Sequence, residues 1–210
     1  MMRTMTAGAS DASFQEKNFY EYHLYTLPRP VTLHDNQVKQ IALIDPATTP
    51  VAKAYTFDGW RGGKDVRVSL EFTNSEANHL GMPLPAGKVR LYKSDTDGSL
   101  QFIGEDRIDH TPRNEKVTLQ TGNAFDITAD RNRTDYKRLS NTTHEESYSV
   151  ELHNRKEGPV TVLVRDRFGG DWKVTEQSQK GKKVDASTNE WAVKLPANGE
   201  VTLTYTVRVN

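Results

Sequence analysis

Cysteine is absent from the 210-residue chain, and its absence removes several kinds of site. Disulfide bonds cannot form, and neither a thiolate zinc site nor an iron–sulfur cluster can be built. An excess of either charge is missing as well, because 28 Lys and Arg side chains balance 28 Asp and Glu side chains. Nucleic-acid-binding proteins usually carry a basic surplus, so we expect no nucleic-acid partner.

Long apolar runs and helical spacing are also lacking. No apolar run approaches the roughly 20 residues that cross a bilayer, so we expect no transmembrane segment in this stretch of chain. Apolar spacing of three and four residues is not sustained, and the short segment Thr134–Leu139 is only a weak helix candidate. The apolar content of 35% is low enough to suggest disorder, but the apolar residues follow a regular pattern.

That pattern is alternation with a period of two. In Val66–Phe72 and in Val201–Val209, apolar residues alternate with polar ones, as in strands with one buried face. Turn-forming pairs such as Asp97-Gly98 separate further short strands. Parallel sheets need long crossover helices, for which the chain offers no candidates. We therefore predict an all-β protein made of two consecutive antiparallel β-sandwich units of the immunoglobulin-like type.

Composition suggests how the chain is divided. Residues 1–16 are small, polar and aperiodic, and we interpret them as a linker or disordered tail. The residues around Pro112 lack apolar side chains, so we place the boundary between the two units there. The predicted first sandwich unit is 17–112, and the predicted second, immunoglobulin-like unit is 113–210.

Several segments beyond the tail match the pattern of a known family. They are Phe19–Ile41, Glu71–Ser75, Leu84–Tyr92, Phe102–Asp106, Asp166–Trp172 and Leu195–Tyr205. In these segments the chain resembles the bacterial domain-of-unknown-function family found at the C-terminal end of mucoidy-inhibitor-A-like proteins. The resemblance implies an exported or periplasmic protein of a Gram-negative bacterium, with a β domain and a coiled coil ahead of this region. It also implies that the chain is a C-terminal fragment, and it supplies no activity and no catalytic residues.

The charged stretch Asp126–Arg138 is the first candidate site. Arg131 and Arg133 would suit an anionic or sugar-like ligand, because guanidinium groups form fork-shaped pairs of hydrogen bonds. The alternative, which we favour, is a solvated edge strand whose charges oppose edge-to-edge association.

Arginines beside aromatic residues form the second candidate. Arg165, Arg167 and Trp172 would suit a partner-binding loop, because interface hot spots are rich in both residue types. The favoured alternative is that Trp172 starts a strand and packs inward. Trp60, in a glycine-rich loop, is a candidate platform for a sugar ring, and a role in filling the core explains it at least as well.

Metal and cofactor motifs are missing from the sequence. The six histidines show no zinc spacing, and no P-loop, dinucleotide-binding or nucleophile-elbow motif occurs, so we expect no metal and no cofactor. Asp106 and Asp109 would serve a hydrolase only if a pocket brought both carboxylates together, and alternation places them on opposite faces of a strand.

The leading hypothesis is therefore a non-catalytic β-sandwich module with an interaction or structural role in a cell-envelope protein. Its partner would be an envelope protein or glycan, and the sequence leaves the oligomeric state undetermined. A carbohydrate-binding module is one alternative, and a hydrolase with converged carboxylates is another.

Overall fold

Strands dominate the fold. The computed structural model describes residues 15–27, 30–39 and 47–210. Strands account for 60% of it and helix for 3%, which confirms the all-β class. The elements are β1 (Gln15–Phe19), β2 (Tyr22–Thr26), β3 (Ala52–Asp58), η1 (Gly59–Arg61), β4 (Asp65–Thr73), η2 (Glu76–Asn78), β5 (Gly87–Ser94), β6 (Leu100–Ile108), β7 (Lys116–Arg138), β8 (His144–Asn154), β9 (Val160–Arg167), β10 (Trp172–Gln177), β11 (Lys182–Lys183), β12 (Thr188–Leu195) and β13 (Glu200–Val209).

One sheet holds nine of these strands, in the order β10-β13-β8-β7-β4-β3-β9-β12-β11, while β1–β2 and β5–β6 form two-stranded sheets. Neighbours in the large sheet are antiparallel, except for the parallel pair β3 and β9. Strands from both predicted units share this sheet, so the arrangement as two consecutive immunoglobulin-like sandwiches is not confirmed. The boundary at residue 112 stays a prediction, and hydrogen bonds between β4 and β7 connect the two sides of it.

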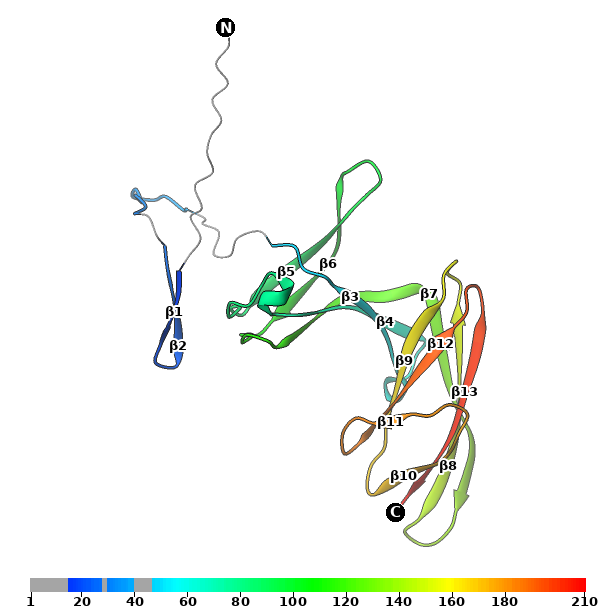
Figure 1. The fold of residues 1–210 in the computed structure, drawn as a ribbon. Coiled ribbons are helices and arrows are strands. Elements are labelled where there is room, and N and C mark those ends of the chain that lie inside the picture. Colours follow the sequence, from blue (N-terminus) through cyan, green and yellow to red (C-terminus); the bar gives the residue numbers. More distant parts are fainter. Residues whose placement is uncertain (1–14, 28–29, 40–46) are drawn as a thin grey trace.

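The large sheet folds over, so that its two arms face each other across a core (Figure 1). Trp191 of β12 stacks on Tyr205 of β13 with 4.3 Å between ring centroids, although five strands separate β12 from β13 in the sheet order. Alternation supplies this core, because every second residue of these strands points inward. The buried cluster consists of Phe57, Val66, Ile127, Ala129, Tyr148, Val150, Leu152, Val162, Val164, Phe168, Trp172, Trp191, Val193, Leu195, Leu203, Tyr205 and Val207.

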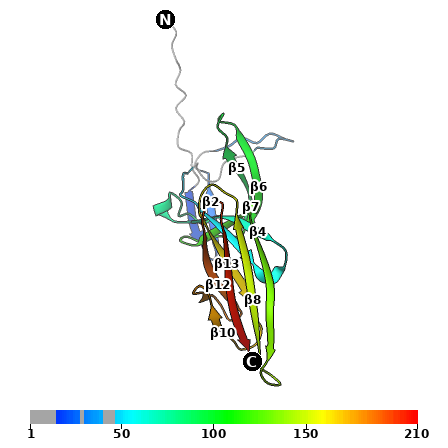
Figure 2. The same ribbon diagram turned by 90° about the vertical axis from the view of Figure 1, so that its right-hand side faces the viewer.

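The long strand β7 links this core to a second, smaller one. Its first part pairs with β4 and buries Val117 and Leu119 against Leu84. Partly buried side chains of β4, β5 and β6 complete this small core. Strands β5 and β6 lie far from the C-terminus of the chain (Figures 1 and 2).

The second part of β7 contains the charged stretch. It pairs with β8 as far as Arg138, whereas its pairing with β4 ends at Thr128. Within the described residues, Ala129–Arg138 therefore has a strand partner on one side only. The segment is not solvated throughout, because the Arg131 side chain is only 20% exposed. The weak helix candidate at Thr134–Leu139 is wrong, because the chain stays extended in β7 up to Arg138.

The two hairpins differ in how they are held. The turn of β5–β6 has a hydrogen bond from Asp95 N to Ser99 O of 2.8 Å, and Gly98 adopts a φ of 83°, which suits glycine. In the described ranges, β1 and β2 pair with each other and with no other strand, in the register Gln15 to Thr26 through Phe19 to Tyr22. Side-chain contacts with the loops beyond β4 and β6, described below, attach it to the rest of the protein.

Candidate functional site

Four of the six residues singled out in the sequence lie at one end of the folded sheet. The Arg167 guanidinium lies over the Trp60 ring, with 4.4 Å from Cζ to the ring centroid. Gly59, which precedes Trp60, lies so close to two other arginines that an added Cβ would be 2.7 Å from Arg131 Cδ and 3.4 Å from the Arg165 carbonyl oxygen. The 3₁₀ turn η1 thus packs on the end of β9 and brings these residues together.

Arg165 belongs to an ion-pair cluster on the outer face of β9 and β12. Its Nε lies 2.7 Å from Glu190 Oε2, and Lys182 Nζ lies 3.0 Å from Glu190 Oε1. The Glu190 side chain is only 6% exposed. Burial raises the pKa of Glu190, but hydrogen bonds from Lys182 and Arg165 outweigh burial and hold the pKa below its usual value. Arg165 is therefore occupied by a partner within the chain.

Arg131 points inward, toward the opposite arm of the sheet. Its Nε and Nη2 each lie 2.7 Å from Asp166 Oδ2, and Asp166 is fully buried. The Tyr205 hydroxyl donates a short hydrogen bond to the same carboxylate. The Arg131 guanidinium also lies 3.7 Å from the centroid of the Tyr148 ring, a cation–π contact. Arg131 therefore ties the arms together and is not presented to a ligand.

Arg133, the other arginine of the charged stretch, joins this network from the surface. Its Nη1 lies 3.2 Å from Glu146 Oε1, and its side chain is 55% exposed. Glu146 in turn accepts a short hydrogen bond from the Tyr148 hydroxyl. A continuous polar chain thus leads from Arg133 through Glu146 and Tyr148 to the buried Arg131–Asp166 pair.

We expect this network to make the fold sensitive to alkaline pH. Burial raises the pKa of Tyr148 to about 12, and burial also raises that of Tyr205, from a usual value of 10.0. As pH rises, the unfolded chain therefore loses these protons before the folded protein does. The contribution of the two tyrosines to the free energy of unfolding is fully present below pH 10 and decreases as pH rises above it. The unfolding temperature should decrease between about pH 9 and about pH 12, and it should decrease less steeply in the Tyr205→Phe variant than in the wild type. If the unfolding temperature depends on pH in the same way in both proteins, Tyr205 does not cause the alkaline sensitivity.

Trp172 and Trp60 differ in what they offer a partner. Trp172 is 6% exposed, and its Nε1 donates to the Ala186 carbonyl oxygen at 2.7 Å. It begins β10 and packs inward against Phe168, as the packing interpretation expects. Trp60 is half-buried, and Arg167 covers one face of its ring. A sugar ring would have only the opposite face of Trp60 available.

A buried carboxylate near η1 lines a small hollow that the sequence did not indicate. The Asp58 side chain is 2% exposed, forms an ion pair with Arg67, and has Arg61 Nε at 3.3 Å. The hollow, of about 240 Å³, is open to solvent beside these three residues. Alternation in β3 marks Phe57 as the inward residue, so nothing in the sequence distinguishes Asp58 from an ordinary exposed acid.

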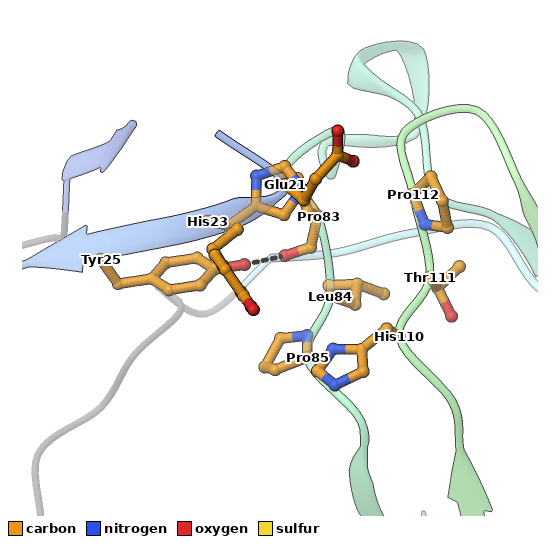
Figure 3. A pocket seen from close by; sticks show the side chains of 10 residues that line it. Glu21, His23, Tyr25, Pro83, Leu84, Pro85, His110, Thr111 and Pro112 are labelled. Atoms are coloured by element: carbon orange, nitrogen blue, oxygen red, sulfur yellow. Dashed lines mark hydrogen bonds between the residues drawn. The ribbon is translucent and has the colours of Figure 1, made fainter. Parts of the chain in front are cut away.

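A larger hollow, of about 480 Å³, lies between hairpin β1–β2 and two proline-containing loops (Figure 3). The Tyr25 hydroxyl donates a hydrogen bond of 2.8 Å to the Pro83 carbonyl oxygen. Arg113 Nη2 lies 2.7 Å from Glu16 Oε2, which gives a second attachment of the hairpin. The hollow is lined by Glu21, Tyr22, His23, Tyr25, Pro83, Leu84, Pro85, His110, Thr111 and Pro112.

The floor of this hollow consists of the loop residues 83–85 and 110–112. One side chain that is fully buried, Asn74, holds these two loops together. Its Nδ2 donates to the carbonyl oxygens of Met82 at 2.8 Å and Pro112 at 3.0 Å, and its Oδ1 accepts the Gly81 N–H at 3.0 Å. One amide thus fixes both loops. Leu84 and Thr111 add a reciprocal pair of backbone hydrogen bonds of 2.9 Å.

The two histidines of the hollow are held in opposite tautomers when neutral. His23 Nδ1 lies 2.8 Å from Glu16 Oε1, and because a carboxylate only accepts, this nitrogen carries the proton. His110 Nδ1 accepts the Ala86 N–H at 3.2 Å, so its proton sits on Nε2. The hydrogen bond from His23, together with Arg113, lowers the pKa of Glu16 and keeps it ionised. Neutral His23 thus has an acceptor Nε2, and neutral His110 has a donor Nε2.

Sequence reasoning missed this hollow because its parts are distant along the chain. The aromatic run at Phe19–Tyr25 and the prolines after Met82 were visible separately, and no periodicity connects them. Asp106 and Asp109, the hydrolase candidates, line neither hollow: the Asp106 carboxylate accepts the N–H groups of Arg107 and Gln120, and Asp109 follows the end of β6.

The fold and this hollow define the chain as an all-β protein with an aromatic hairpin over a proline-rich floor. No family model, curated protein or solved structure matches it. In the part of the chain that the structure describes, no helix is long and apolar enough to cross a bilayer. The same residues contain no group of three His, Asp or Glu side chains placed to hold a metal ion.

Proposed function

We propose that the chain is a non-catalytic interaction module of a cell-envelope protein and that hairpin β1–β2 is its contact surface. The observation that carries the proposal is the exposure of the hairpin's aromatic side chains: Phe19 is 65%, Tyr20 89% and Tyr22 71% exposed. Aromatic residues are enriched at protein interfaces, and clustered exposed apolar side chains mark binding sites. The envelope location is supported by the sequence resemblance.

The turn of the hairpin supports the same conclusion. Tyr20 adopts a φ of 58°, in the left-handed region that glycine occupies without strain and a bulky side chain occupies at a cost. A two-stranded hairpin is itself only marginally stable in water. A strained, highly exposed tyrosine at its tip therefore works against folding, which is typical of a residue kept for binding.

The test compares immobilised wild-type protein with a Phe19→Ser/Tyr22→Ser variant. We expect a defined set of proteins from a solubilised Gram-negative envelope extract to be retained by the wild type and lost with the variant. Both side chains face solvent, so the unfolding temperature should stay within about 2 °C of wild type. Quantitative mass spectrometry of the retained proteins provides the measurement.

Tyr92→Ser is the matched control, because Tyr92 is a 51% exposed tyrosine on the other hairpin, β5–β6. It should retain the same proteins as the wild type. Equal retention by the Phe19→Ser/Tyr22→Ser variant would show that β1–β2 is not the contact surface. Robust turnover of an envelope glycan without any binding partner would overturn the non-catalytic assignment.

A further inference from the structure

We propose that the hollow beneath hairpin β1–β2 binds a proline-rich peptide in the polyproline II conformation, with a basic residue beside the prolines. This inference rests on the proposed function, since it gives the chemistry of a partner at the same hairpin. Its basis is the combination of ring surfaces, hydrogen-bonding groups and charge around the hollow.

Ring surfaces form most of the wall. Tyr22 and Tyr25 are the aromatic residues that line it from the hairpin. Pro83, Pro85 and Pro112 contribute pyrrolidine rings from the loops opposite (Figure 3). Aromatic-lined grooves are the usual receptors for polyproline II segments, whose proline rings project as ridges and lose little entropy on binding. The volume of about 480 Å³ lies within the range of roughly 300–1,000 Å³ found for ligand pockets.

The hydrogen-bonding groups suit a ligand that is rich in acceptors. A polyproline II segment has no internal hydrogen bonds, and its prolines lack N–H groups, so it presents mainly carbonyl oxygens. His110 Nε2 is a donor in the neutral tautomer, because Nδ1 accepts the Ala86 N–H. The Tyr22 hydroxyl has no hydrogen-bond partner among the described residues and is a second donor. His110 and Tyr22, which both line the hollow, are thus able to donate hydrogen bonds to the carbonyl oxygens of such a peptide.

Charge at the rim selects the residue beside the prolines. Glu16 is already paired with His23 and Arg113. Glu21, at the edge of the hollow (Figure 3), has no ion-pair partner in the described part of the chain. One carboxylate therefore remains unbalanced beside a ring-lined surface, which favours an arginine or lysine next to the prolines.

The probe is a synthetic decapeptide in which arginines are flanked by prolines, and binding is measured by titration calorimetry. We expect saturable binding, with shifts in the NMR signals of the His110 ring and the Tyr25 ring. Tyr22→Ala should weaken binding by at least about tenfold, since it removes one of the two tyrosine side chains that line the hollow. Tyr92→Ala, on the other hairpin, should bind as the wild type does.

Two further comparisons test charge and conformation. Glu21→Gln should weaken binding of the arginine peptide about threefold to fivefold, and leave a version with glutamine in place of arginine unaffected. This difference should disappear in about 0.5 M salt. A peptide with serine in place of proline should bind at least about tenfold more weakly, because it lacks the preformed conformation.

The possible contrary results distinguish a wrong peptide assignment from a wrong proposed function. Absence of peptide binding, binding that Tyr22→Ala leaves unchanged, or tighter binding of an oligosaccharide such as chitotetraose would overturn the inference. If the peptide fails while envelope proteins still require Phe19 and Tyr22, only the peptide assignment falls. If the peptide binds at the hollow while envelope proteins ignore those two side chains, the proposed function falls and the peptide site remains.

Discussion

Replacing Arg131 with methionine should lower the free energy of unfolding by about 3–5 kcal/mol. Arg131 is the cation that faces the fully buried Asp166 carboxylate, with two contacts of 2.7 Å. Methionine fills much of the same space, so the loss comes from an uncompensated buried charge and not from a cavity. Urea unfolding followed by tryptophan fluorescence measures the effect, because Trp191 lies in the same core.

The control is the double variant Arg131→Met/Asp166→Asn. Breaking a buried ion pair on one side is costly, whereas removing both charges is often close to neutral. The double variant should therefore recover at least about half of the stability lost in Arg131→Met, through the coupling that a double-mutant cycle measures. If the single variant costs less than about 1 kcal/mol, or if the double variant is less stable than Arg131→Met, the ion pair does not hold the arms together.

The signal for this buried pair was present in the sequence. Ile127 and Ala129 are inward residues of β7, and Arg131 continues the same alternation. Val164 and Asp166 stand in the same relation in β9. A basic and an acidic residue that each extend an apolar face predict a pair inside the core. The charge of its neighbours alone predicts a surface position for Arg131, which the structure does not show.

The strands were predictable because alternation is a local property. Val66–Phe72 and Val201–Val209 are strands β4 and β13, as expected. The single nine-stranded sheet was not predictable, because pairing depends on partners distant along the chain. β7 shows why: it changes partner from β4 to β8 around Thr128, and Gly122 has a φ of 122° where the register with β4 shifts. In the sequence, the glycine at such a register shift predicts the end of a strand and not its continuation.

The candidate site was hidden for the same reason. Tyr22 and His23 lie in one segment, while Pro83 and His110 lie in two others, and only the fold brings the three together. An internal clue exists in Asn74, since a polar amide that follows the strand Val66–Phe72 is a frequent device for holding loops. Its hydrogen-bond partners, however, are backbone groups. Because almost every residue has such groups, the sequence does not indicate which ones Asn74 contacts.

Asn74→Ala should lower the free energy of unfolding by about 2–4 kcal/mol and should also loosen the hollow. Alanine leaves the buried carbonyl oxygens of Met82 and Pro112 and the N–H of Gly81 without their partner. Both loops of the floor depend on that amide, so their amide hydrogens should exchange faster with solvent. Binding of the proline-rich peptide should weaken by at least about fivefold, although Asn74 itself lies behind the floor.

Asn154→Ala separates this local effect from a general loss of stability. Asn154 is equally buried, and its Nδ2 donates to the carbonyl oxygens of Gly158 at 3.0 Å and Pro196 at 2.8 Å. It therefore clamps two loops with the same chemistry, at the end of β8 and away from the residues that line the hollow. Both variants should lose similar stability in urea, but only Asn74→Ala should lose peptide affinity and show faster exchange at Leu84 and Thr111. Equal loss of affinity in both would mean that the hollow responds to overall stability and not to the amide beneath it.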